Sequence, residues 1–414
     1  MAQSTNRVIA HYERYVMNTY TRSPLVLTKG KGSRVWDVEG REYLDLFPGW
    51  GVSGLGYNHP WVMTALRGQS GRVIHISNNY YHPLQAQAAK QLVELSFDGK
   101  VFFSNSGAEA VETAVKLVRR WGHSANGAGI GQAGGRYEII AMQQSFHGRT
   151  MAAVSATGQS KHRQGFEPLV PGFVHVPFND LEAVRRAVTL KTVAVLVEPI
   201  QGEGGVNIAG EAFLKGLRTL CDEQKLLLIF DEVQTGMGRT GTWFAYQHSG
   251  VEPDVMLLAK TLGGGFPIGA VIAKRAIAET LTPGTHATTY GGSPLGCACI
   301  LAVIEAIKKQ ALLERVNRFG PYILKRLEKL KARVPFITDV RGRGFMIGIE
   351  LTIDGRPLVD ACRTKRLLIN CTQERVLRLL PAMTITKAQL DRALQILEDV
   401  LTHDEAGAMP AARA

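Results

Sequence analysis

The sequence predicts an α/β fold, in which helices flank a mostly parallel sheet and a second, smaller α+β domain follows. Short apolar strands alternate with helical patterns through the middle of the chain. Several strands are apolar throughout, which is typical of strands covered on both faces, as in parallel sheets. After Pro294 the pattern changes to longer amphipathic helices, which indicate the smaller domain. The expected strands of the sheet are residues 101–104, 137–142, 173–176, 192–197, 226–230 and 255–259.

Two helices can be placed from their ends. Asn179 and Asp180 precede a helical pattern that begins at Leu181, which is typical of a capped helix start. Near the C-terminus, residues 387–401 form the last amphipathic helix. A stretch rich in glycine, alanine and serine predicts an irregular loop at residues 122–135.

The composition is that of a globular protein large enough for two domains. Of the 414 residues, 45% are hydrophobic and 20% are charged. The apolar runs are too short to span a membrane, and the first residues lack the apolar stretch of a secretory signal. The five cysteines include no CxxC-type pair, so we predict reduced thiols, a cytoplasmic location and no metal site. The net charge of +12 is spread along helical stretches, so neither nucleic acid nor a membrane is expected as a partner.

Two charged side chains close strands that are predicted to be buried. Lys260 follows residues 255–259 and precedes a glycine-rich stretch, while Asp231 follows residues 226–230. A lysine removed from water loses its proton more easily and becomes a nucleophile. Pyridoxal phosphate requires an amine for its aldehyde and a carboxylate for its ring nitrogen, and this pair offers both. Taken singly, Lys260 could be a solvated surface residue and Asp231 a helix cap.

A phosphate site is predicted where a strand turns into a helix. Residues 101–104 are followed by Asn105 and then by a helix with one apolar face. Unpaired backbone amides converge at such a helix start, so Ser106, Gly107 and Ala108 could hold a phosphate. An ordinary turn with a capping serine explains the segment equally well.

Further candidates follow other strands. Phe146 could stack on a planar ring and Arg149 could bind a carboxylate, although core packing and a surface ion pair are simpler explanations. Glu198 and Glu203 stand among glycines, and residues 286–294 offer hydroxyl groups in a glycine-rich turn that a plain loop also explains. Because ligands of parallel α/β sheets bind at the carboxyl ends of the strands, we expect these groups to meet around one cofactor.

The chain resembles the class III pyridoxal-phosphate-dependent aminotransferases through an ordered set of motifs that covers residues 10–400. The resemblance implies fold type I, with a large cofactor-binding domain and its seven-stranded sheet at residues 56–293. It implies a small domain at residues 294–404, against which an N-terminal segment, residues 1–55, packs; residues 405–414 are expected to be a disordered tail. It also implies a homodimer whose two active sites lie at the subunit interface. The matching motifs are residues 104–110, 145–150, 198–205, 231–241, 258–260, 286–294 and 341–344.

The resemblance implies a role for individual motif residues. Lys260 holds the cofactor aldehyde as an imine and moves a proton during catalysis, while Asp231 pairs with the ring nitrogen. The other implied cofactor contacts are Ser106, Gly107 and Ala108 at the phosphate, Phe146 and Val233 on the ring faces, Gln234 at the ring hydroxyl and Thr289 from the neighbouring subunit. The implied substrate contacts are Arg149, Glu203, Thr288 and Arg378, with Trp50 as a further candidate.

The implied reaction transfers the terminal amine of N-acetylornithine to 2-oxoglutarate, giving N-acetylglutamate semialdehyde and glutamate in arginine biosynthesis. In the family pattern Arg378 receives the α-carboxylate of glutamate, and Glu203 pairs with Arg378 while the other substrate is bound. Three features depart from that pattern. Trp50 replaces a small aliphatic residue or tyrosine, Ser293 replaces an asparagine, and the loop at residues 122–135 is longer. Trp50 could change which amine fits, or it could pack under the N-terminal segment.

Other functions stay open at the level of the sequence. The same scaffold could act on ornithine, succinylornithine, 4-aminobutyrate or a lysine-pathway amine. From a different class, the chain could be a catalytically silent ligand-binding or nucleic-acid-binding protein, as its charge of +12 would allow. The presence of both Lys260 and Asp231 argues against a silent protein.

Overall fold

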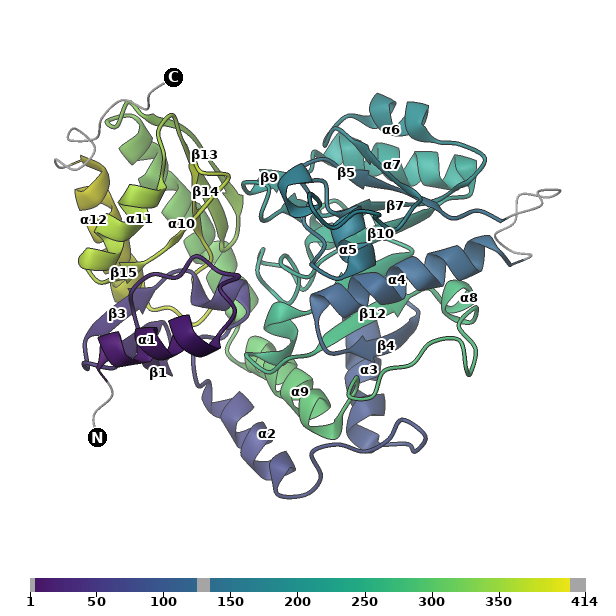
Figure 1. The fold of residues 1–414 in the computed structure, drawn as a ribbon, viewed down its shortest axis with the longest axis horizontal. Coiled ribbons are helices and arrows are strands. Elements are labelled where there is room, and N and C mark those ends of the chain that lie inside the picture. Colours follow the sequence, from purple (N-terminus) through teal and green to yellow (C-terminus); the bar gives the residue numbers. More distant parts are fainter. Residues whose placement is uncertain (1–3, 125–134, 403–414) are drawn as a thin grey trace.

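A seven-stranded sheet forms the larger part of the protein in this computed structural model, which describes residues 4–124 and 135–402 (Figure 1). The strand order is β4-β12-β11-β10-β7-β5-β6, and only β12 runs antiparallel to its neighbours. The predicted α/β fold with a mostly parallel seven-stranded sheet is therefore confirmed. The strands are β4 (Lys100–Ser104), β5 (Glu138–Met142), β6 (Phe173–Val176), β7 (Thr192–Val197), β10 (Leu227–Asp231), β11 (Val255–Leu258) and β12 (Gly269–Ala273).

The predicted helix starts are also observed. Asp180 is the N-cap of the helix that begins at Leu181, and its Oδ1 accepts a hydrogen bond from the amide of Ala183 at 2.8 Å. The α-helices of the described residues are α1 (Thr5–Tyr15), α2 (Pro60–Ser70), α3 (Pro83–Leu95), α4 (Gly107–Gly122), α5 (Met151–Ala156), α6 (Leu181–Ala187), α7 (Glu211–Gln224), α8 (Arg275–Ala278), α9 (Pro294–Lys309), α10 (Leu312–Lys331), α11 (Arg356–Thr364) and α12 (Lys387–Thr402).

Helices cover both faces of the seven-stranded sheet, which explains why its strands are apolar throughout. In β10, Leu228 and Phe230 belong to a core that includes residues of α3, α7 and α9. Leu227 and Ile229 point to the other face and pack with α4 and α5. Successive side chains of a strand alternate between the two faces, so each face needs its own apolar set.

Two smaller sheets lie beside the large one, at the left of Figure 1. The first is antiparallel, has the order β13-β14-β17-β16 and contacts α10 through β13. The second has the order β1-β2-β3-β15, in which β15 pairs with β3 and so joins the C-terminal part to the N-terminal segment. The strands are β1 (Leu27–Lys31), β2 (Arg34–Asp37), β3 (Glu42–Asp45), β13 (Ile337–Arg343), β14 (Met346–Leu351), β15 (Leu367–Leu368), β16 (Asn370–Thr372) and β17 (Val376–Leu379).

A two-stranded hairpin, β8 (Ile200–Gln201) and β9 (Asn207–Ile208), projects from the end of β7 toward the antiparallel small sheet. Its connecting residues contain Glu203, so the hairpin brings one predicted site residue to the boundary between the sheets. The domain limits given above remain our proposal for how these parts divide.

Two predictions concern residues outside the described ranges. Most of the loop at residues 122–135 and the tail at residues 405–414 fall there. In the part that is described, no helix has the length and apolar character needed to cross a bilayer. All five cysteines are described, and no disulfide joins any two of them.

Candidate active site

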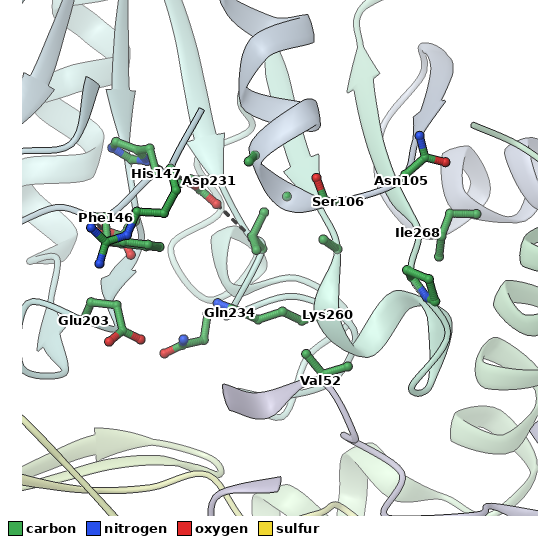
Figure 2. A pocket seen from close by; sticks show the side chains of 18 of the residues that line it. Val52, Asn105, Ser106, Phe146, His147, Glu203, Asp231, Gln234, Lys260 and Ile268 are labelled. Atoms are coloured by element: carbon green, nitrogen blue, oxygen red, sulfur yellow. Dashed lines mark hydrogen bonds and ion pairs between the residues drawn. The ribbon is translucent and has the colours of Figure 1, made fainter. Parts of the chain in front are cut away.

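A cavity of about 440 Å³ lies where the carboxyl ends of β4, β5, β7, β10 and β11 come together (Figure 2). Its volume is in the range of sites for small molecules. The structure brings ten of the predicted site residues to its wall, which is the meeting of strand ends that the sequence predicts. These residues are Ser106, Gly107, Ala108, Phe146, Arg149, Glu203, Asp231, Val233, Gln234 and Lys260.

Lys260 follows β11 and extends across the cavity toward the middle of Figure 2. Its φ of 46° is in the left-handed region, which is uncommon for a residue with a Cβ and is a strain often found at functional sites. Removal from bulk water lowers the pKa of the Lys260 ammonium, although the charges of Glu203 and Asp231 act in the opposite direction. The amine is thus nearer to its nucleophilic, uncharged form than a surface lysine.

Asp231 is the last residue of β10, and only 5% of its side chain is exposed to solvent. Oδ1 accepts a hydrogen bond from the amide of Val233 at 3.0 Å, and Oδ2 lies 2.8 Å from Nδ1 of His147. Both oxygens are therefore held in place. The sequence left His147 without a role, since nothing local shows that it meets a residue 84 positions away.

Glu198 follows β7 and is a second buried carboxyl group in the cavity wall. It accepts hydrogen bonds from the amides of Phe146 at 3.1 Å and Gly202 at 3.3 Å. Burial raises the pKa of Glu198 to about 7. Its bonds tie the segment that carries Phe146 to the segment that leads to Glu203.

The N-terminus of α4 faces the cavity. Ser106 is the N-cap, and its Oγ accepts a hydrogen bond from the amide of Glu109 at 3.2 Å. The amides of Gly107 and Ala108 lie in the first turn, where no carbonyl within the helix can pair with them. A Cβ on Gly107 would lie 2.9 Å from Cγ1 of Val233, so only glycine lets the helix start come this close to the wall. The arrangement suits an anion.

Phe146 and Arg149 share one side of the cavity. The Arg149 guanidinium lies 5.5 Å from the centre of the Phe146 ring, and His162 packs edge-on against that ring at 5.7 Å. Burial, together with the charge of Arg149, lowers the pKa of His162 to about 4. Arg149 has no ion pair with any described residue, so its charge is available to an anionic ligand in the cavity.

Glu203 and Arg378 form a bidentate ion pair. Nη1 of Arg378 lies 2.6 Å from Oε1 of Glu203, and Nη2 lies 3.1 Å from Oε2. Oδ1 of Asn370 accepts a further bond from Nη2 at 2.9 Å. Burial raises the pKa of Glu203, but the charge and hydrogen bonds of Arg378 outweigh this effect and lower it overall. Glu203 is part of the cavity wall, whereas Arg378 is fully buried behind it.

Besides Arg378, three predicted residues are not in the wall of this cavity as the described chain forms it. Trp50 is 50% exposed, and its ring centre lies 5.8 Å from the Arg378 guanidinium. The hydroxyl of Thr288 accepts a hydrogen bond from Asn105 at 3.1 Å and so supports a wall residue. Thr289 is exposed on the surface. Their roles toward ligand remain predictions.

Several wall residues were not chosen from the sequence. Asn105, His147 and Glu198 stand inside the motifs, and their signal was adjacency to the residues chosen. The glycine-rich stretch after Lys260 did not indicate which later side chains would line the cavity. The wall residues for which no individual role was predicted are Val52, Asn105, His147, Gly148, Glu198, Ala259, Gly265, Phe266, Pro267 and Ile268.

The chain is similar to aminotransferases over almost its full length. The acetylornithine aminotransferase of Methanocaldococcus jannaschii is 47% identical over 390 residues, which are 94% of this chain and 96% of that protein. The crystal structure of the ornithine aminotransferase of Toxoplasma gondii ME49 has a TM-score of 0.91 at 34% identity, over 96% of this chain and 95% of that one. The N-acetylornithine aminotransferase of Stenotrophomonas maltophilia K279a has a TM-score of 0.80 at 36% identity, over 95% and 98%.

The resemblance stated from the motifs is confirmed by these matches. A family model described as Aminotransferase class-III matches residues 15–401. Enzymes of this kind use pyridoxal 5'-phosphate, so the cofactor prediction is confirmed as well. The family match and the folded cavity agree, and this chain belongs to the class III aminotransferases.

Proposed function

We propose that the enzyme transfers the terminal amino group of N-acetylornithine to 2-oxoglutarate, with N-acetylglutamate semialdehyde and glutamate as products. The observation that carries this proposal is the pairing of Glu203 with Arg378 at the edge of the cavity that contains Lys260. While Glu203 is paired with Arg378, the two charges cancel at the edge of the cavity; when Glu203 moves away, the positive charge of Arg378 is uncovered. The two substrates differ in whether they bring a carboxylate to Arg378.

The wall residues fit pyridoxal 5'-phosphate. The α4 N-terminus suits the phosphate, Asp231 suits the ring nitrogen and Phe146 suits a ring face, while Lys260 offers the amine that would hold the aldehyde. The small residues at Gly107 and Ala108 leave room for a phosphate against backbone amides. When bound, this cofactor withdraws electrons from the carbon that bears the substrate amine, which makes that carbon acidic.

The protein then has to move a proton at that carbon. We assign this to Nζ of Lys260, because burial lowers its pKa and its position at the end of β11 faces the cavity. The carboxylate of Asp231 is oriented by its hydrogen bonds with Val233 and His147, so it could pair with a protonated ring nitrogen. Val233 and Gln234 would complete the cofactor contacts, with Thr289 contributed by a second subunit.

Arg378 explains how two substrates can use one site. Removal of one partner from a buried ion pair is strongly destabilising, so the fully buried Arg378 needs a carboxylate beside it when Glu203 is the partner that leaves. Glu203 supplies it while N-acetylornithine is bound, and Arg149 and Thr288 are the proposed contacts for that donor. The α-carboxylate of glutamate or 2-oxoglutarate would take the place of Glu203, which moves aside. A ligand without such a carboxylate cannot compensate for the departure of Glu203.

A donor panel tests the substrate. The purified holoenzyme is assayed with 2-oxoglutarate and N-acetylornithine, ornithine, succinylornithine or 4-aminobutyrate, and we expect the highest kcat/KM for N-acetylornithine. Lys260→Ala should abolish turnover and the visible absorbance of the bound cofactor. Borohydride reduction should attach the cofactor to Lys260 in the wild type. Higher kcat/KM with another donor would reject N-acetylornithine as the substrate, and labelling elsewhere would reject Lys260.

Ornithine is a second candidate donor. It is favoured by the similarity to the Toxoplasma gondii enzyme and by an aromatic residue, Trp50, beside Arg378. The lower identity of that enzyme, 34% against 47% for the Methanocaldococcus jannaschii protein, makes ornithine the less favoured donor.

We infer a homodimer with shared active sites and a cytoplasmic location. The dimer is supported by a group of exposed apolar side chains near Thr289, since a monomer rarely leaves such large aromatic groups in water. Reduced cysteines without a disulfide support the location. Light scattering should give twice the mass of 45.2 kDa. The exposed side chains are Ile74 at 57%, Tyr80 at 68%, Tyr81 at 104% and Tyr290 at 63%.

A further inference from the structure

The main chain at Glu203 is held by side chains from the antiparallel small sheet. Oγ1 of Thr372 and Nε2 of Gln373 both donate hydrogen bonds to the carbonyl oxygen of Glu203, each at 2.7 Å. Arg378, which binds the carboxylate of the same residue, lies on the next strand of that sheet. One sheet therefore holds both ends of Glu203.

The far side of the β8–β9 hairpin is fixed in the same way. Nη2 of Arg341 donates to the carbonyl oxygen of Gly205 at 2.7 Å, and its Nε lies 3.2 Å from the carbonyl oxygen of Val206. Val206 has a φ of 57°, a costly conformation for a β-branched residue, and it is fully buried. With the backbone fixed on both sides, Glu203 can leave Arg378 only by rotation of its side chain.

Gln373 also reaches the segment that carries the ring-stacking residue. The same Nε2 donates to Oε1 of Gln159 at 3.0 Å. Nε2 of Gln159 lies 3.2 Å from the carbonyl oxygen of Gln144 and 3.3 Å from that of Ser145, the residue before Phe146. Gln159 is 7% exposed, so these bonds are shielded from water. Gln373 is thus bonded to the Glu203 main chain and, through Gln159, to the strand end beside Phe146.

The turn that presents Gln373 is conformationally costly. Gln373 and Glu374 have φ values of 49° and 61°, in the left-handed region that is unfavourable for a residue with a Cβ. A glycine or asparagine at either position would lower that cost. The strained backbone has an explanation if this conformation is needed to place the side chain of Gln373 at the carbonyl oxygen of Glu203.

We propose that Gln373 is a positioning residue that fixes the main chain of Glu203, so that the carboxylate alone switches between its two positions. The inference rests on the proposed function of the Glu203–Arg378 pair. Loss of the Gln373 amide should let the Glu203 backbone drift and leave Arg378 partly uncovered when N-acetylornithine is bound. Glutamate, which displaces the Glu203 carboxylate in any case, should be affected much less.

The test compares Gln373→Met, which keeps the length of the side chain and removes the donor, with Glu374→Met. Glu374 has the same left-handed backbone in the same turn, but its side chain is exposed and outside the site. Stopped-flow absorbance of the holoenzyme gives kcat/KM for each half-reaction. We expect Gln373→Met to slow the N-acetylornithine half-reaction roughly three- to tenfold, the effect of one or two hydrogen bonds, and to leave the glutamate half-reaction within about twofold. Glu374→Met should change neither.

Glu203→Ala separates this inference from the proposed function. If Glu203→Ala leaves the ratio of the half-reactions unchanged, the proposed switch is wrong. If Glu203→Ala shifts the ratio, the switch stands. The positioning role of Gln373 is then overturned by either of two results: Gln373→Met leaves the ratio unchanged, or Gln373→Met still changes it when Glu203 has already been replaced by alanine. Crystal structures of the two Met variants give a second test that does not depend on enzyme activity. A displaced Glu203 main chain in Gln373→Met alone supports the inference, and an unmoved one rejects it.

Discussion

Arg378 and Arg239 both lie at the junction of the sheets and are at most 1% exposed, but they have different partners. Arg378 has a carboxylate partner, Glu203, in a bidentate pair. Arg239 has no acidic partner among the described residues. It donates only to backbone carbonyl oxygens, those of Pro381 at 2.6 Å and of Gly51 and Phe345 at 3.4 Å each.

The difference separates an arginine with a proposed role in substrate binding from one whose contacts are structural. The partner of Arg378 is a side chain that can rotate and be exchanged for another carboxylate. The partners of Arg239 are main-chain atoms from the N-terminal segment and from two places in the C-terminal part, and these cannot leave without unfolding. Burial without a counter-ion lowers the pKa of Arg239 to about 10, which still leaves it charged at neutral pH. We therefore expect Arg378 to control substrate choice and Arg239 to control stability.

The largest effect should come from Arg378→Leu. Glutamate and 2-oxoglutarate would lose the guanidinium for their α-carboxylate, and removal of one partner of a buried charge pair costs about 3–5 kcal/mol. We expect kcat/KM of the glutamate half-reaction to fall at least 100-fold, by stopped-flow absorbance. Arg378→Leu combined with Glu203→Leu removes both charges and should recover stability but not the glutamate reaction. A single variant with wild-type glutamate kinetics would end the functional side of the comparison.

The next effect concerns stability. Arg239→Met keeps much of the side-chain volume and leaves three buried carbonyl oxygens without this donor, so we expect a loss of about 2–4 kcal/mol in the free energy of unfolding. Thermal melting checks this. The ratio of kcat/KM between the two half-reactions should stay at the wild-type value. If the ratio moved as much as in Glu203→Ala, Arg239 would have to be counted with the substrate site.

The same contrast shows where sequence-based prediction succeeds. The strands of the parallel sheet lie within one residue of their predicted ends, because strands covered on both faces have continuous apolar runs that local sequence reveals. β12 was not predicted. It begins with glycine and alanine, which favour strands weakly, and a Cβ on Gly269 would lie 2.4 Å from the carbonyl oxygen of Ser106.

Site residues were predictable only where a motif holds them. Lys260 and Asp231 are recognisable at strand ends, but the pairing of Glu203 with Arg378 joins residues 175 positions apart. That pair came from family resemblance, not from any local pattern. Arg239 stands in a recognised motif, yet no role could be assigned to it, because its burial is created by three segments that meet only in the folded chain. Gln373 is in no motif and is visible only through its hydrogen bonds.

The pH dependence of stability should also differ between the two arginines. The pKa of Glu203 is lowered from its usual 4.5 in the folded protein, so its contribution is complete above that value and is lost as the pH falls through the folded pKa. We expect Glu203→Gln to be less stable than wild type by about 1.5–3 kcal/mol at pH 7, with the gap closing below about pH 4.5. Arg239 has no titrating partner, so the gap for Arg239→Met should stay constant from pH 4 to 7. Melting temperatures across that range compare the two.

The smallest expected effect is that of Trp50→Ala. The ring is half exposed and lies 5.8 Å from the Arg378 guanidinium, and a cation–π contact of this kind contributes about 0.5–1 kcal/mol. We expect a roughly two- to fivefold change in the preference between N-acetylornithine and ornithine, measured as a ratio of kcat/KM values. Trp50→Phe keeps an aromatic face and should change the ratio less. Alanine has the same left-handed backbone cost, since φ at Trp50 is 61°, so strain does not differ between the variants. A lower melting temperature with an unchanged ratio would assign Trp50 to packing under the N-terminal segment and leave Glu203 as the side chain that decides what Arg378 binds.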